Sequence, residues 1–174
     1  MVQKSVLNEK TILCVDDEPD ILAVVKEEIL SIAPRCIIHT ATSYKTAVEL
    51  MSSFTYDLAI FDIMGVRGYD LLETASRRPR PLPVVVLTAN AFSPESLKRC
   101  IELGARAYLP KQQLGELVPF LEDVLIYEYG AVWNRVLKQI EGFVHEDWGP
   151  YWRKPDEGFW RRFEAKIIEK KGER

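Results

Sequence analysis

Five short apolar segments, each separated from the next by a stretch with helical spacing, dominate residues 11–109 of the sequence. They are Thr11–Val15, Cys36–Thr40, Leu58–Phe61, Val84–Leu87 and Ala107–Leu109. Continuous apolar strands are typical of parallel sheets, because helices cover both faces of such sheets. The alternation predicts an α/β fold of the flavodoxin-like class, a doubly wound five-stranded parallel sheet in the order 2-1-3-4-5.

The stretches between these segments predict helices at Ile21–Ile32, Ser43–Met51, Tyr69–Ser76 and 93–104, and a fifth helix from about Glu116. Two of the expected helices begin with residues that favour a helix start. Ser43 is a candidate N-cap. Ser93 precedes a proline, which suits the first helical position. Gly104 predicts the end of the helix that Ser93 opens.

Polar residues follow the expected strands at the point where each strand ends. Asp16 and Asp17 follow the first strand, Asp62 follows the third, Thr88 ends the fourth, and Lys111 lies just after the fifth. In a parallel sheet these ends converge on one edge, where ligands bind. Carboxylate oxygens suit Mg²⁺, and a lysine and a hydroxyl beside them suit the oxygens of a transferred phosphoryl group.

Four motifs carry a resemblance to a known family. They are Ile12–Pro19, Asp57–Asp62, Val84–Ala89 and Gly104–Lys111. In this order and spacing they resemble the CheY-like receiver domain of two-component response regulators, over about residues 8–128. The resemblance implies a phosphorelay protein that accepts a phosphoryl group from a sensor histidine kinase or a phosphotransfer protein. It implies signalling through protein contacts, and no enzymatic activity.

The resemblance also implies roles for single residues. Asp62 would be the phosphoacceptor, a nucleophilic carboxylate. Lys111 would pair with the phosphoryl group, and Thr88 would bond to it after transfer. Tyr108 would be the switch aromatic, which changes rotamer together with Thr88.

The same resemblance implies a Mg²⁺ site. Its ligands would be Asp16, Asp17, Asp62 and the backbone carbonyl of Met64. The loop after Asp62 is about two residues shorter than is usual in the family and lacks its proline. Gln112 follows Lys111 where the family usually has a cis-proline. Because a cis bond before a non-proline residue costs about 3 kcal/mol, we expect a trans bond there.

The composition changes from about Gly130 onward. All four tryptophans lie beyond this point, and residues 130–174 hold 10 basic and 8 acidic residues. Apolar residues at helical spacing predict a helical extension over 129–174. Its aromatic face packs on the chain's own receiver domain or forms an interaction surface for a second copy or a partner, and the two can coexist. If the helix from about Glu116 continues past Tyr127 to Phe143, it would project from the receiver and favour a homodimer.

Composition argues against several other classes of protein. The formal net charge of −3 lacks the basic excess of a nucleic-acid binder, so nucleic acid is not an expected partner. No apolar run reaches the ~20 residues that span a bilayer, and Met1–Lys10 has no apolar stretch like a signal peptide. The three cysteines lack C-x-x-C spacing, which argues against disulfides and zinc. The expected location is the cytoplasm.

Three alternatives to the phosphorelay interpretation remain open. A receiver-like interaction module could work without phosphate, since the loops at 63–68 and 111–115 are altered. A transcription regulator would need a DNA-binding motif, and the extension has none that we recognise. A phosphatase of the haloacid-dehalogenase type would carry a second aspartate two positions after Asp62, where this chain has Met64.

Overall fold

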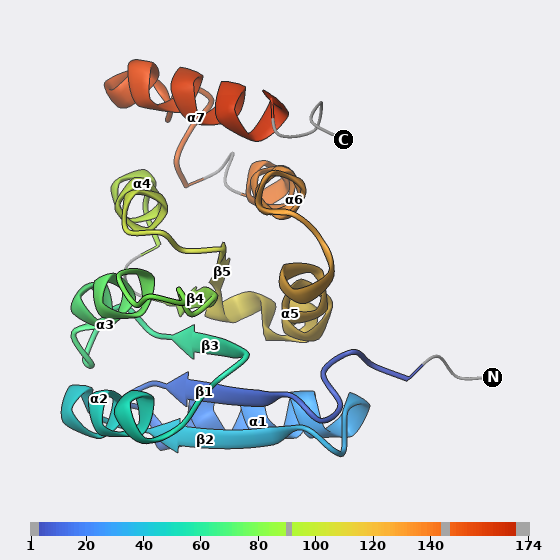
Figure 1. The fold of residues 1–174 in the computed structure, drawn as a ribbon. Helices are drawn as coiled ribbons and strands as arrows, with labels where there is room; N and C mark the ends of the chain where they lie inside the picture. Colours follow the sequence, from blue (N-terminus) through green and yellow to red (C-terminus); the bar gives the residue numbers. More distant parts are fainter. Residues whose placement is uncertain (1–3, 90–91, 144–146, 170–174) are drawn as a thin grey trace.

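The computed structural model describes residues 4–89, 92–143 and 147–169 and contains one parallel sheet of five strands (Figure 1). The strands are β1 (Thr11–Val15), β2 (Ile37–Ala41), β3 (Leu58–Phe61), β4 (Val84–Thr88) and β5 (Ala107–Pro110). Their order is β2-β1-β3-β4-β5, and every neighbouring pair is parallel. The predicted fold class and strand order are confirmed.

Seven α-helices accompany the sheet in the described part of the chain. They are α1 (Pro19–Ile32), α2 (Tyr44–Ser53), α3 (Gly68–Ser76), α4 (Pro94–Glu102), α5 (Leu117–Ile126), α6 (Tyr129–Phe143) and α7 (Glu157–Glu169). Two 3₁₀ helices, η1 (Lys111–Glu116) and η2 (Lys154–Asp156), precede α5 and α7. Helices cover both faces of the sheet, with α1 and α5 packed together and α2 packed against α3 (Figure 1).

The strands differ in burial, and of the two edge strands only β2 is open to solvent. Every residue of β3, β4 and β5 is buried, and only Thr11 of β1 is partly exposed. β2 lies at an edge of the sheet, and Ile37 there is 52% exposed. Burial on both faces explains why the central strands are continuous apolar runs rather than alternating ones.

Helix starts follow the predicted capping residues. Ser43 Oγ accepts a hydrogen bond from the backbone N–H of Thr46 at 3.2 Å. Ser93 Oγ accepts one from the backbone N–H of Ser96 at 3.1 Å, and Pro94 opens α4. Each cap satisfies a backbone donor that the first helical turn leaves without a partner.

The helix that begins after η1 ends at Ile126, so the continuous helix from Glu116 to Phe143, which the sequence left open, does not form. Tyr127 has an extended backbone, with φ −102° and ψ 157°, and its N–H donates to the carbonyl of Asp123. A new helix, α6, begins at Tyr129 and lies beside α5 and β5 (Figure 1). The break turns α6 back onto the protein, where its apolar face is buried instead of projecting into solvent.

The aromatic side chains of the extension pack inside the chain. Trp133, Trp152 and Trp160 are buried, and Trp148 is half-buried. The indole N–H of Trp133 donates to the carbonyl of Ala105 at 3.2 Å, which satisfies its one polar atom. The extension therefore packs on its own receiver domain. A homodimer through 129–174 stays a prediction.

Within the residues that the structure describes, no helix is both long enough and apolar enough to cross a membrane.

Candidate functional site

Three aspartates meet at the carboxyl edge of the sheet. Asp16 and Asp62 are 4% and 5% exposed, whereas Asp17 is exposed. One carboxylate oxygen from each of the three lies within 4.8 Å of the others. The convergence follows from the topology, because β1 and β3 are adjacent and parallel and both end at this edge.

Backbone hydrogen bonds fix the two buried carboxylates. The N–H of Asp62 donates to the carbonyl of Val15 at 2.9 Å, which ties the end of β3 to the end of β1. Asp62 Oδ1 accepts from the N–H of Ile63 at 2.8 Å, and Asp16 Oδ1 accepts from the N–H of Glu18 at 2.9 Å. Each carboxylate thus has one oxygen engaged by the backbone and its Oδ2 directed toward Lys111.

Lys111 lies among three carboxylates. Its Nζ is 2.7 Å from Asp16 Oδ2, 3.0 Å from Glu18 Oε1 and 3.4 Å from Asp62 Oδ2. The lysine side chain is only 8% exposed. Its peptide bond to Gln112 is trans, as the missing proline predicts. With this trans bond, Lys111 still reaches the carboxylate of Asp62.

Burial and mutual repulsion shape the titration of the cluster. Burial, followed by the negative charge of Asp16, raises the pKa of Asp62 to about 6. Burial also raises the pKa of Asp16, although its hydrogen bond from Lys111 opposes this. Burial alone would lower the pKa of Lys111, but its partners Asp16, Glu18 and Asp62 outweigh burial and raise it. One lysine thus faces several carboxylates, an arrangement that favours an added cation.

The short loop between β3 and α3 passes close to the acidic cluster. A Cβ atom on Gly65, which has φ +80°, would lie 2.3 Å from the carboxyl group of Asp17. A Cβ atom on Gly68 would lie 2.1 Å from the carbonyl oxygen of Asp62. A side chain at position 68 would therefore require the backbone to move, whereas at position 65 the carboxyl group of Asp17 would have to shift and the positive φ favours glycine. Met64 lies in this loop with its side chain 53% exposed, and its carbonyl as a metal ligand stays a prediction.

Thr88 and Tyr108 lie next to each other on adjacent strands. Val86 pairs with Tyr108 and Thr88 pairs with Pro110, so Thr88 and Tyr108 project from the same face, one diagonal step apart. Both are fully buried. Thr88 Oγ1 has no hydrogen-bond partner among the described residues. A buried hydroxyl left unsatisfied in this way costs about 1–3 kcal/mol.

The site includes contacts that sequence reasoning missed. Glu18 pairs with Lys111, and Gly68 packs against the backbone of Asp62. Glu18 stands in the first motif beside the two aspartates, a signal that could have marked it. Nothing in the sequence marks the close approach of Gly68, because it depends on the path of the shortened loop.

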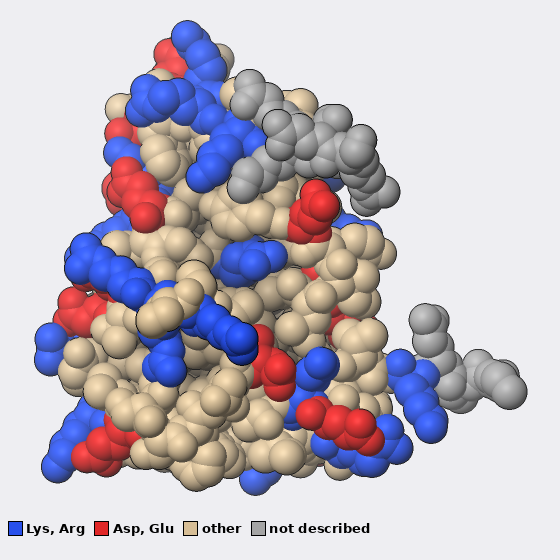
Figure 2. All heavy atoms as spheres, viewed as in Figure 1, with Lys and Arg blue, Asp and Glu red and all other residues tan. Residues whose placement is uncertain are grey.

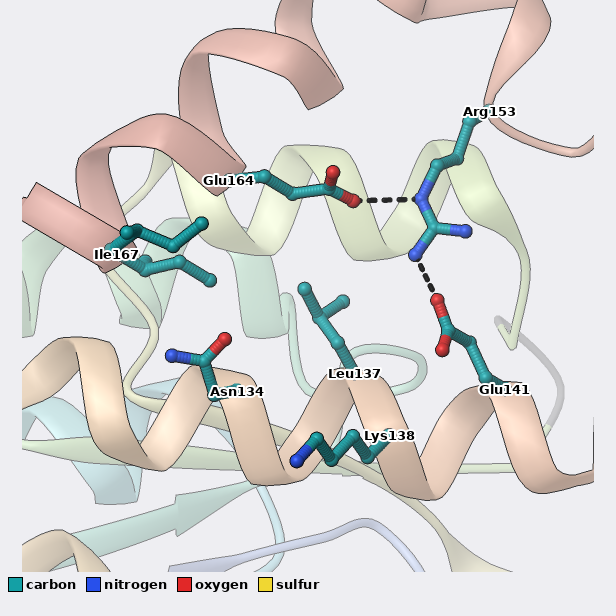
Figure 3. A pocket seen from close by; sticks show the side chains of 8 residues that line it. Asn134, Leu137, Lys138, Glu141, Arg153, Glu164 and Ile167 are labelled. Carbon is teal, nitrogen blue, oxygen red and sulfur yellow. Dashed lines mark hydrogen bonds and ion pairs between the residues drawn. The ribbon is translucent and has the colours of Figure 1, made fainter.

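A separate cavity of about 470 Å³ lies between α6 and α7, and all the residues that line it belong to the C-terminal extension. Arg153 bridges Glu141 and Glu164 at its margin, and Leu137 and Ile167 point into it (Figure 3). None of the strand-end residues lines it, so it is distinct from the acidic cluster.

Comparison with known proteins agrees with this geometry. A family model described as the response regulator receiver domain matches residues 12–121, which end before α6. A putative response regulator from Chloroflexus aurantiacus has a similar structure, with a TM-score of 0.61 and 25% identity. That match covers 68% of this chain and 98% of the other.

Two curated relatives are much longer than the matched region. A probable cyclic di-GMP phosphodiesterase from Vibrio cholerae is 33% identical over 109 residues, which make up 60% of this chain and 24% of that protein. A protein-glutamate methylesterase/protein-glutamine glutaminase from Photorhabdus laumondii is 32% identical over 112 residues, or 63% of this chain and 32% of that protein. This chain therefore spans no more than about a third of either relative. Both the motifs and the matched residues coincide with the sheet that holds the acidic cluster, and the chain belongs to the response regulator receiver domain family.

Proposed function

We propose that the chain is a phosphorelay receiver in which Asp62 accepts the phosphoryl group. The observation that carries this proposal is the pair of buried carboxylates, Asp16 and Asp62, sharing the ammonium of Lys111 at the carboxyl edge of the sheet. If Lys111 served only in a structural ion pair, a single carboxylate partner would be enough. A second buried carboxylate raises the pKa of Asp62 and creates a charge imbalance that suits a metal and a phosphoryl group.

In the transfer step, Asp62 Oδ2 is the nucleophile, because Oδ1 is held by the N–H of Ile63. It attacks the phosphorus atom of a phosphohistidine. The new O–P bond forms as the P–N bond breaks, and the histidine ring, which carries a proton on its other nitrogen, leaves with the bonding electron pair as neutral imidazole. The product is an aspartyl phosphate.

Asp16, Asp17, Asp62 and the Met64 carbonyl would hold Mg²⁺. Their oxygen donors fit this ion, and the three side chains already lie within reach of one another. When bound, the ion offsets the negative charge of the carboxylates and of the phosphoryl oxygens.

Lys111 and Thr88 would stabilise the transferred group. Lys111 already lies 3.4 Å from Asp62 Oδ2, close to where the phosphoryl oxygens would be. Thr88 supplies a buried hydroxyl with no competing partner among the described residues. Both are held in place before the transfer, which is what electrostatic stabilisation requires.

The proposed partners are a sensor histidine kinase or a phosphotransfer protein, with output through protein contacts in the cytoplasm. The chain would consist of a receiver at 8–128 and a helical extension at 129–174. The two relatives are named for enzymatic activities, but the matched region makes up no more than about a third of either protein. We therefore assign no enzymatic activity to this chain.

The surface charge gives no support to nucleic-acid binding. In Figure 2, Lys and Arg side chains gather over the region of α3 and α4, with Asp and Glu side chains beside them. Several are paired, among them Arg67 with Asp70, Arg77 with Glu73 and Lys98 with Asp156. Paired cations are less available for phosphate backbones than a continuous basic stripe.

The experiment is intact-mass measurement after incubation with Mg²⁺ and acetyl phosphate. The wild type is expected to gain one phosphoryl group, and Asp62→Asn none, because an amide is a poor nucleophile. Asp57→Asn, at the opposite end of β3, serves as the matched control and is expected to gain the group normally. Failure of both the wild type and the control with acetyl phosphate and with a histidine kinase would favour the phosphate-independent interaction module.

A further inference from the structure

An unbroken series of aromatic contacts joins the sheet to the C-terminal extension. The ring of Tyr108 stacks on Phe92 with centroids 5.6 Å apart, and Phe92 contacts Trp148 at 4.7 Å. Trp148 meets Trp152 at 5.3 Å, and Trp152 meets Trp160 at 4.9 Å. We call these five side chains the aromatic relay. It begins next to Thr88 and ends on α7.

Further contacts hold the extension against α4 and β5. Lys98 of α4 forms an ion pair with Asp156 of η2 at 2.8 Å. The same ammonium lies 5.3 Å from the ring centroid of Phe159 on α7. In Figure 1, α7 lies over both α4 and α6. The extension therefore covers the side of the receiver that surrounds Tyr108.

The relay constrains Tyr108. The ring is fully buried, with Phe92 stacked on it and β4 beside it. Movement of the Thr88 side chain toward Asp62 changes the space next to Tyr108, because packed interiors have few voids. Phe92 contacts both Tyr108 and Trp148, so it joins the side chain beside Thr88 to the extension.

We propose that the extension is a regulatory element of the acceptor site and that the aromatic relay couples the two. The docked extension packs Phe92 against Tyr108, and Tyr108 in turn limits the space beside the Thr88 hydroxyl that would bond to a phosphoryl group on Asp62. Docking and phosphorylation then stabilise each other, and this coupling is reciprocal. The phosphoryl part of this proposal rests on the proposed function of Asp62.

The test uses the full chain and beryllium fluoride with Mg²⁺, a probe that forms a phosphoryl-like adduct with a carboxylate. Trp148→Ala and Phe92→Ala are each expected to weaken binding of the probe by about 5-fold or more. Trp148→Phe keeps an aromatic ring and is expected to restore most of the affinity. Tyr151→Ala is the matched control, because Tyr151 is an aromatic of the same segment that is 68% exposed and outside the relay; its binding should equal the wild type's.

Intrinsic fluorescence supplies a second readout, since all four tryptophans lie in the extension and none in the receiver. The probe is expected to reduce quenching of the tryptophans by acrylamide in the wild type, and to have no such effect in Phe92→Ala. Without any probe, Tyr108→Ala is expected to increase quenching, because Phe92 loses its stacking partner.

The outcomes separate the two proposals. If the wild type and Trp148→Ala bind the probe equally and quenching is unchanged in Tyr108→Ala, the aromatic relay does not couple the extension to the acceptor site. The proposed function of Asp62 then still stands. If the wild type neither binds the probe nor gains a phosphoryl group, the proposed function fails and the coupling to phosphorylation fails with it.

Discussion

The Nζ atom of Lys111 lies 3.4 Å from Oδ2 of Asp62, and both side chains are almost completely buried. The two residues are 49 positions apart in the sequence and reach the same point because β3 and β5 end at the same edge. In the proposed function, where Asp62 is the nucleophile, the buried lysine beside it has a direct chemical use. It can bind the oxygens of a group that the carboxylate receives.

Replacement of Lys111 by methionine should slow phosphoryl transfer by roughly 100-fold, the usual effect of losing one stabilising donor in an active site. The measurement is the rate of mass gain with acetyl phosphate and Mg²⁺. Lys45→Met is a suitable control, because that lysine side chain is 86% exposed on α2 and lies outside the site. Equal rates for Lys111→Met and the wild type would exclude Lys111 from the transfer.

Stability should depend on pH through Asp62 when no metal is present. Its pKa rises from 3.8 to about 6 on folding, so the folded chain holds this proton more tightly than the unfolded chain does. The free energy of unfolding therefore falls as pH rises between these values. The fall is on the order of a few kcal/mol at most, since one pKa unit corresponds to about 1.4 kcal/mol and Asp62 titrates together with Asp16.

Urea denaturation in EDTA, at a series of pH values from about 4 to 7, measures this effect. The wild type should lose more stability across this range than Asp62→Asn does. Adding Mg²⁺ should reverse the loss at the upper end, because a ligand that binds only the folded state stabilises it. Parallel curves for the wild type and Asp62→Asn would contradict the assignment of the raised pKa.

Gly68→Ala should disturb the acceptor site. The added methyl group would lie 2.1 Å from the carbonyl oxygen of Asp62, so the loop must shift. We expect a loss of about 1–3 kcal/mol of stability, typical of overpacking, together with reduced phosphorylation. Gly115→Ala is the matched control, since a Cβ atom there meets nothing within 4 Å. If thermal denaturation and mass gain are the same for the two variants, the described path of the loop is wrong.

Removal of residues 130–174 should change solubility or oligomeric state. The deletion takes away Trp133 and the rest of the aromatic face, and it exposes the apolar surface of β5 on which α6 packs. Large exposed apolar patches promote association. Light scattering after size-exclusion chromatography would detect it. A well-behaved monomer with unchanged solubility would contradict the packing of the extension.

Much of the fold and the acidic cluster could be predicted from sequence, because both depend on local patterns. Apolar runs identify strands, and a parallel sheet brings Asp16, Asp62 and Lys111 to one edge whatever the details of packing. The break at Tyr127 was missed because apolar residues continue through it and no proline marks it. The contact of Phe92 with Trp148 was also missed, since it joins residues 56 positions apart and no periodicity reports on it.

The most direct test of the central claim is to locate the phosphoryl group. Borohydride reduces an aspartyl phosphate to homoserine, and peptide mass mapping then identifies the converted residue. We predict that the wild type, treated with acetyl phosphate and Mg²⁺, is converted at position 62 alone. Conversion at Asp16 or Asp17, or phosphorylation that leaves Asp62 intact, would contradict the account.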